Sequence, residues 1–190
     1  MTVPVWLLDV DGVLNAARPG WGAAPRRAVA FSGGMNWPIR WAPALLNRIR
    51  ALHASGMVEI RWCTTWCPDA ENLERLFRLP ALPRALDMNP VPRGAEGQAL
   101  KLAAAKRVLE DEGRYLVWTD DDAVPASWLL REELAADGRA LLISPPPRRG
   151  LQPPDMDAIE EFARAHQPTL DMRSSGRRAR PRGSDPVAGA

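Results

Sequence analysis

Residues 5–15, VWLLDVDGVLN, decide the fold of this chain, because an apolar run ends there abruptly in two carboxylates and a glycine. Four apolar residues in a row, residues 5–8, are typical of a strand that is buried on both faces. Asp11 and Gly12 then predict a turn. The pattern therefore places Asp9 and Asp11 at the carboxyl end of a buried strand, which is the edge where open α/β sheets bind ligands.

Two carboxylates this close together have a specific chemical consequence. Neighbouring carboxylates repel each other and are costly to desolvate. Mg²⁺ relieves both effects, since it takes oxygen ligands and suits one or two carboxylates together with a substrate phosphate. The alternative is an ordinary strand followed by an Asp-Gly turn, and residues 5–15 alone do not choose between the two.

The composition is that of an ordinary globular protein. The chain has 190 residues, of which 46% are hydrophobic and 25% are charged, and its formal net charge is +2. This length suits one domain with a substantial core. Cys63 and Cys67 are too few for a disulfide framework and lack the spacing of a zinc site, so we expect both to be reduced. We expect neither a signal peptide nor a membrane span, and hence a soluble, cytoplasmic protein.

Predicted strands and helices alternate along the chain. After the first strand, strands are predicted at residues 58–66, 115–119 and 139–144, with a short further candidate at 86–88. Helices are predicted at residues 42–55, 68–79, 98–112, 126–136 and 154–166. The alternation predicts an α/β fold, in which a three-layer, Rossmann-like parallel sheet has helices on both faces. Glu59 and Arg61 alternate with apolar residues and indicate polar contacts on one face of their strand.

We expect one domain over residues 1–171, with a flap at about residues 16–41 above the active edge of the sheet. A structureless loop of that length is unusual in a compact domain, and Arg26 to Ser32 predict part of a β-hairpin within it. Its tryptophans are expected to pack the flap down rather than face a substrate. Residues 172–190 are rich in Ser, Gly, Arg and Pro and predict a disordered basic tail.

Polar residues follow three of the predicted strands. They are Asp9 and Asp11, Thr64 and Thr65, and Asp120 to Asp122. If the strands are parallel, all three groups meet at one edge of the sheet. Lys101 lies near the start of the helix before the last group, with Lys106 as the alternative. Thr64 taken alone favours a plain strand end, and Lys101 is equally consistent with a solvated helix residue. We expect Asp122 to cap the following helix.

In this order and spacing, the motifs resemble those of the haloacid dehalogenase-like (HAD) superfamily of phosphohydrolases over about residues 3–145. The family's four motifs are matched by Asp9-Val10-Asp11-Gly12, by Thr64 with Thr65 as the second choice, by Lys101, and by Asp120 with Asp121. Residues 62–66 (WCTTW) and 118–122 (WTDDD) also resemble a bacterial subgroup whose HAD domains are associated with RNA repair.

The resemblance implies a Mg²⁺-dependent phosphohydrolase that works through an aspartyl-phosphate intermediate. Asp9 would attack phosphorus, and Asp11 would protonate the leaving oxygen and then activate water. Lys101 would neutralise charge on the phosphate. The implied substrate-binding residues are Thr64, Thr65 and Lys101. The implied Mg²⁺ ligands are Asp9, the backbone carbonyl of Asp11, Asp120 and Asp121.

The segments where this family carries cap domains are short here, which predicts a minimal cap and an open site. Such a site admits a phosphorylated substrate as large as a nucleic acid end, or a nucleotide. Five arginines between residues 173 and 182 favour nucleic acid, although a merely solvated tail is the stronger interpretation. The alternatives are a non-catalytic binding module on the HAD fold and a phosphotransferase. Loss of Asp9 or Asp11 would have indicated a binding module, and both are present.

Overall fold

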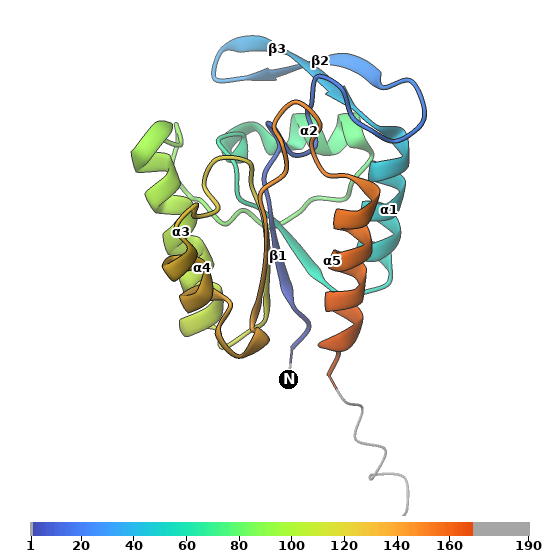
Figure 1. The fold of residues 1–190 in the computed structure, drawn as a ribbon. Helices are drawn as coiled ribbons and strands as arrows, with labels where there is room; N and C mark the ends of the chain where they lie inside the picture. Colours follow the sequence, from blue (N-terminus) through green and yellow to red (C-terminus); the bar gives the residue numbers. More distant parts are fainter. Residues whose placement is uncertain (1, 169–190) are drawn as a thin grey trace, which may run out of the picture.

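The computed structural model describes residues 2–168 of the chain. Within them, four parallel strands form one sheet in the order β4-β1-β5-β6. The strands are β1 (Val5–Leu8), β4 (Glu59–Trp62), β5 (Leu116–Thr119) and β6 (Ala140–Ile143). Helices flank this sheet on both faces (Figure 1), so the predicted α/β class with a three-layer, Rossmann-like parallel sheet is confirmed.

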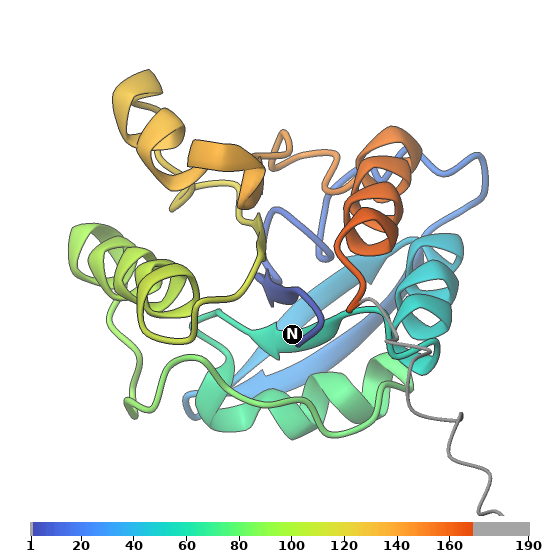
Figure 2. The same cartoon turned by 90° about the horizontal axis from the view of Figure 1, so that it is seen from below.

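The helices form two layers around the sheet. α1 (Pro43–Ala54) and α5 (Pro153–Ala165) pack together on one face, and α3 (Gly94–Glu110) and α4 (Trp128–Leu134) lie on the other (Figures 1 and 2). α2 (Ala70–Phe77) lies beside the β2 strand described below. Short 3₁₀ turns cover Cys67–Asp69 and Ala136–Gly138. Between residues 2 and 168, no helix combines the length and the apolar character that crossing a bilayer requires.

The core lies on both faces of the sheet and contains three tryptophans. Every residue of β1 and β5 is buried, which explains their uninterrupted apolar sequences. Trp6, Trp62 and Trp118 are fully buried. The Trp6 indole N–H donates to the Thr119 hydroxyl at 2.9 Å, and the Trp62 indole N–H donates to the Glu74 carboxylate at 3.0 Å. Two of the three indoles are therefore held by a buried polar partner, as large amphipathic side chains require.

The strand expected at residues 86–88 was wrong. The chain pairs with the edge of β4 only at Arg84, where it forms an isolated bridge to Trp62. Leu86 is buried by packing rather than by strand pairing, and Met88 is 43% exposed. Nearby prolines lack the N–H that a longer ladder needs. β4 itself also ends at Trp62, earlier than the predicted strand.

The predicted helices are present with shifted ends. The largest shift is in α3, which begins at Gly94 rather than at residue 98, directly after the proline-rich connection. The helix predicted over residues 68–79 divides into a 3₁₀ turn and α2, and Arg78 ends α2 in the left-handed conformation, with φ of 55°. None of these shifts changes the topology.

The segment expected to be a flap contains an antiparallel hairpin of β2 (Arg26–Ser32) and β3 (Met35–Trp41), so the predicted hairpin is confirmed. Its two-residue turn, Gly33 and Gly34, has positive φ at both positions, as a type I′ turn requires. Trp41 packs edge-on against Phe77 of α2, with ring centroids 5.5 Å apart. The hairpin lies across the end of the sheet where the parallel strands finish (Figure 1). The limits of the predicted domain stay a prediction, and the basic tail at residues 172–190 lies outside the described residues.

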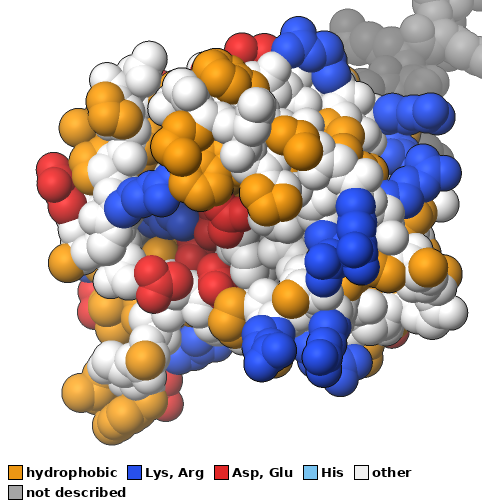
Figure 3. Space-filling view, turned by 90° about the horizontal axis from the view of Figure 1, so that it is seen from above, with side chains coloured by type: hydrophobic (Ala, Val, Ile, Leu, Met, Phe, Trp, Pro, Cys, Tyr) orange, Lys and Arg blue, Asp and Glu red, His pale blue; other side chains and the backbone are white. Residues whose placement is uncertain are grey.

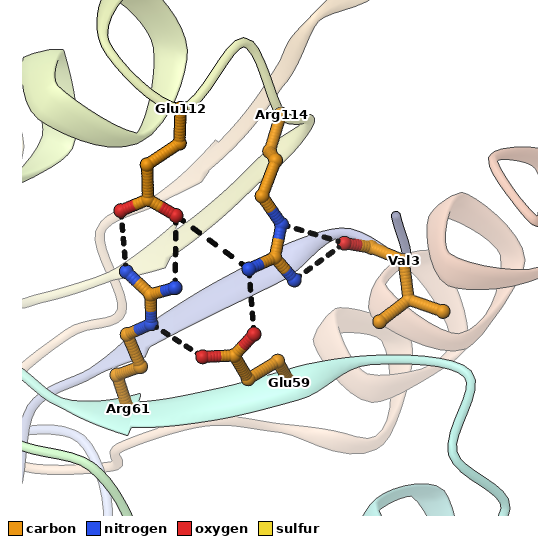
Figure 4. A network of polar contacts seen from close by, with 5 residues as sticks. All are labelled: Val3, Glu59, Arg61, Glu112 and Arg114. Carbon is orange, nitrogen blue, oxygen red and sulfur yellow. Dashed lines mark hydrogen bonds and ion pairs between the residues drawn. The ribbon is translucent and has the colours of Figure 1, made fainter. Parts of the chain in front are cut away.

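A charged network closes the opposite end of the sheet (Figure 4). Arg61 of β4 donates to both oxygens of Glu112, at 2.6 and 2.8 Å, and to Glu59 at 2.7 Å. Arg114 donates to Glu59 at 2.5 Å and to the carbonyl of Val3 at 2.7 and 3.0 Å. The polar contacts indicated by Glu59 and Arg61 in the sequence are thus present, and they join β4 to the chain segments that precede β1 and β5.

Replacing Arg114 with Ala is expected to lower the free energy of unfolding by about 3 kcal/mol, because it leaves Glu59 and Glu112 partly buried without this partner. Urea unfolding measures the change. Lys106→Ala is the control, since Lys106 pairs with Glu133 only at the exposed surface, at 3.4 Å, and its loss should cost under about 1 kcal/mol. Equal losses in the two variants would contradict a structural role for the network.

Candidate active site

Four of the predicted site residues lie together, buried, at the carboxyl edge of the sheet. Asp9 follows β1, Thr64 follows β4, Asp120 follows β5, and Lys101 reaches the same place from α3. Their exposed fractions are 8% or less. Because β4, β1 and β5 are adjacent and parallel, their ends meet here as the sequence predicted.

Lys101 bridges the two central carboxylates. Its ammonium nitrogen lies 2.9 Å from Oδ2 of Asp9 and 2.7 Å from Oδ2 of Asp120. The alternative lysine, Lys106, instead contacts Glu133 on the surface. The position of Lys101 is therefore that of a charge-neutralising residue between the ends of β1 and β5.

The acidic group after β5 is held by its own backbone. Oδ1 of Asp120 accepts the backbone N–H groups of Asp122 and Ala123, at 3.0 and 2.7 Å. The expectation that Asp122 caps the next helix was wrong, because α4 begins later and its N-cap residue is Ser127. The turn after β5 is stabilised by Asp120 instead, which fixes the orientation of that carboxylate.

Asp121 lies directly against the glycine of the first motif. A Cβ atom at Gly12 would lie 2.1 Å from Cγ of Asp121, and Gly12 has a φ of +70°. Both the backbone conformation and the close approach therefore require glycine at this position. Carboxylate oxygens of Asp9, Asp120 and Asp121 all lie within 4.8 Å of one another.

The side chain of Asp11 is not part of that acidic group and is held by two donors. The Asn15 amide donates to Oδ1 at 2.8 Å, and the Trp66 indole N–H donates to Oδ2 at 2.9 Å. Asn15 in turn accepts the backbone N–H of Arg40 in β3 at 2.9 Å. The Asp11 carboxylate is thus outside the candidate metal cluster, and ligation of a metal by its carbonyl stays a prediction. Asn15 and Trp66 were not among the predicted site residues.

The two threonines occupy different positions. Thr64 is fully buried, and its hydroxyl lies close enough to Asp9 to lower the pKa of that carboxyl. Thr65 lines a cavity of about 420 Å³ together with Asp9, Asp11, Lys101 and Asp121. Of the two, Thr65 faces the space that a substrate would occupy. Thr64 supports the nucleophile candidate from behind.

The cavity lies between the start of α3 and the chain segments that follow β1, β4 and β5, and Figure 3 shows a hollow with red carboxylates on this face of the molecule. Arg93, at the start of α3, lines it and lies over the ring of Trp37 in β3, 5.4 Å from the ring centroid. Trp41 is buried, as expected for a packing residue, whereas Trp37 is only partly buried and lines a smaller cavity beside Asp11. Cys63 and Cys67 are free and buried.

The charges of the site are out of balance. Burial raises the pKa of Asp9 to about 7, and the charge of Asp120 adds to this rise while Lys101 opposes it. Burial and Asp120 also raise the pKa of Asp121 to about 6. Burial lowers the pKa of Lys101, but Asp9 and Asp120 outweigh it, so the net shift is upward. Three carboxylates face one lysine, so a further cation would relieve the repulsion between them.

A comparison with protein-family models identifies the family. Residues 5–156 match the model of the HAD domain in Swiss Army Knife RNA repair proteins. The chain belongs to this family. The match spans the whole sheet and all four motifs, so the resemblance stated from the motifs is confirmed. None of the curated proteins compared with the chain matches it.

The acidic cluster of this HAD domain fits a divalent metal ion. Its ligand atoms are carboxylate oxygens, the type that Mg²⁺ and other hard cations take, and the cluster has unbalanced negative charge. Asp9, Asp120 and Asp121 are the residues that would hold the ion. The donor set indicates a hard divalent cation, as HAD domains usually use, and does not by itself name Mg²⁺.

Without metal, the free energy of unfolding is expected to fall as pH rises from about 4 to about 7. Over this range folded Asp9, with a pKa of about 7, keeps a proton that the unfolded chain, with its ordinary pKa of 3.8, releases. The melting temperature in EDTA should therefore be lower at about pH 7.5 than at about pH 5.5, and Mg²⁺ should raise it more at the higher pH.

The variant Asp9→Asn should lose much of this pH dependence, while Asp87→Asn, at an exposed position, should keep it. Differential scanning calorimetry of the three proteins, with and without Mg²⁺, makes the comparison. If the melting temperature in EDTA changed equally between pH 5.5 and pH 7.5 in the wild type and in Asp9→Asn, Asp9 would not be buried with excess negative charge.

Proposed function

We propose that this HAD domain is a Mg²⁺-dependent phosphohydrolase that forms an aspartyl-phosphate on Asp9. The observation that supports it most directly is the contact of Lys101 with both Asp9 and Asp120 beside a third carboxylate, Asp121. At an ordinary strand end, so many buried charged groups would only destabilise the fold. In a phosphoryl-transfer site they can bind the phosphoryl group and its cation, since such transfers depend on positioning and charge neutralisation.

In the first half of the proposed reaction, a carboxylate oxygen of Asp9 attacks phosphorus and the bond from phosphorus to the leaving oxygen breaks. Asp11 gives a proton to that oxygen. Thr65 and Lys101, which line the cavity, bind the phosphoryl oxygens, and the hydroxyl of Thr64 stabilises the Asp9 carboxylate. When bound, Mg²⁺ supplies positive charge that neutralises the phosphate, and we propose as its ligands Asp9, the Asp11 carbonyl, Asp120 and Asp121.

In the second half, Asp11 takes a proton from water, and the water oxygen attacks the phosphorus of the aspartyl-phosphate. The bond from phosphorus to Asp9 breaks, which releases inorganic phosphate and restores the carboxylate. Lys101 stays beside Asp9 throughout and stabilises the charge that returns to it.

We further propose a nucleic acid end or a nucleotide as the substrate. The matched family is described by its occurrence in RNA repair proteins, and Arg93 lines the cavity, with basic side chains beside the hollow in Figure 3. A cytoplasmic location agrees with the two free, buried cysteines.

A screen of phosphate esters, nucleotides and oligonucleotides phosphorylated at either end tests this function. Release of inorganic phosphate is expected with Mg²⁺ and not with EDTA, and Asp9→Asn should lower kcat by a factor on the order of 10⁴ or more. Asp87→Asn is the matched control and should retain activity. Unchanged turnover in Asp9→Asn would refute the assignment of the nucleophile, and phosphate transfer to an acceptor other than water would favour a phosphotransferase.

The orientation of Asp11 by Trp66 gives a second prediction. Trp66→Phe removes one of the two hydrogen bonds to the carboxylate and should lower kcat about tenfold for alkyl phosphates, whose leaving oxygen needs a proton. Turnover of p-nitrophenyl phosphate, whose leaving group needs little protonation, should change much less. Trp21→Phe is the control, because the Trp21 indole donates to the carbonyl of Leu151 instead of to a site residue. Equal losses for both kinds of ester would contradict an orienting role.

A further inference from the structure

The outward face of the β2–β3 hairpin is largely exposed within residues 2–168. Alternate residues of a strand point to opposite faces, and Ala30, Ile39 and Trp41 supply the buried face. The other face combines two arginines with exposed apolar side chains; Val29 is 63% exposed and Phe31 is 50% exposed. Its cross-strand pairs are Arg27 with Arg40, Val29 with Pro38, and Phe31 with Asn36. Figure 3 shows apolar side chains beside the acidic hollow and basic ones around its other side.

The pair of Arg27 and Arg40 is unfavourable unless something negative binds there. The two residues lie directly opposite each other in the hairpin, where like charges destabilise the pairing. Arg40 donates to the carbonyl of Ala17 at 2.5 Å, and among the described residues neither arginine has an acidic partner. Two guanidinium groups without a carboxylate are suited to bind phosphate.

A second cavity connects this pair to the candidate active site. It has a volume of about 410 Å³ and is lined by Arg27, Arg40, Pro38 and Ile39 of the hairpin and by Asp11. Asp11 also lines the first cavity, so the two cavities share this residue. The inference rests on the proposed reaction, in which Asp11 protonates the leaving oxygen. The leaving group therefore departs toward the hairpin.

We propose that the outward face of the hairpin binds single-stranded nucleic acid, with Arg27 and Arg40 on a backbone phosphate and Phe31 stacked on a base. The terminal phosphate then lies at Asp9 and the attached strand runs through the second cavity. Cationic side chains together with an exposed aromatic side chain are typical of surfaces that bind a single strand without sequence preference. A protein partner would leave the opposed guanidinium groups without a matching polyanion, so we favour the nucleic acid.

Binding measured in EDTA tests this surface independently of turnover. The probe is a fluorescently labelled eight-nucleotide strand, made as RNA and as DNA, with a 3′-phosphate, a 5′-phosphate or neither, and the readout is anisotropy with the full chain. Arg27→Gln should weaken binding about tenfold, as for one charge-assisted hydrogen bond. It should also reduce the slope of log Kd against log salt by about 0.7, as for one lost phosphate contact on a single strand.

Arg26→Gln is the matched control. It removes the same charge from the neighbouring residue, which pairs with Trp41 and lines a different cavity with Asn47 and Arg50. Phe31→Ala should weaken binding by about fivefold or more, the size of one lost stacking contact, whereas Trp128→Ala, at a 64% exposed tryptophan of α4, should not.

Equal weakening by Arg27→Gln and Arg26→Gln would overturn the proposal, because only general charge would then matter. Unchanged binding by Phe31→Ala would do the same. Sedimentation of the wild type and Phe31→Ala also tests the surface: a dimer that dissociates in the variant would assign this face to a second copy of the chain. Failure of the phosphatase screen with these binding effects intact would refute the proposed function and leave the surface standing.

Discussion

The contact of Lys101 with Asp9 and Asp120 is the interaction on which the rest of the site depends. Bringing two carboxylates together inside a protein is unfavourable, and the lysine between them makes the arrangement tolerable. It does so incompletely, because Asp121 adds a third negative group and the pKa of Asp9 remains raised to about 7. The site is therefore stable enough to fold and still has a deficit of positive charge, which is the condition for taking up a cation and a phosphate together.

The same deficit bears on how the proposed nucleophile is activated. A carboxyl group with a pKa of about 7 is only partly ionised at neutral pH, and a protonated Asp9 cannot attack phosphorus. In the proposed reaction, a divalent ion held by Asp9, Asp120 and Asp121 would favour the ionised form of Asp9, which is the form that attacks phosphorus. Thr64 and Lys101 act in the same direction, since both lower the pKa of Asp9. In the proposed reaction, burial of Asp9 would therefore make its attack on phosphorus depend on the cations beside it.

The sequence was sufficient to predict the fold class and the residues that converge at the sheet edge, because a parallel sheet places the carboxyl ends of all its strands at one edge. The apolar run before Asp9 and the one before Asp120 each predict a buried strand, and parallel pairing brings their ends together. The sequence was insufficient to predict contacts between side chains of loops that are distant along the chain. Trp66 lies 55 residues from Asp11, and nothing in the periodicity of either segment indicates that an indole donates to that carboxylate. Asp122 failed as a helix cap for a related reason, since the backbone after β5 uses Asp120 to close its turn.

The hairpin connects the proposed acid, Asp11, to the surface that we propose binds the substrate strand. Its backbone holds Asn15 through the N–H of Arg40, and Asn15 holds Asp11. The side chain of Arg40 lines the second cavity on the way to the same carboxylate. A ligand that contacts Arg40 therefore acts on the strand that orients the proposed acid, with one asparagine between them. A nucleic acid strand bound along the hairpin would be held in place by this element. It would also stabilise the position of β3 in which Asp11 faces the leaving oxygen, so that recognition of a long substrate and protonation of its leaving group depend on the same few hydrogen bonds.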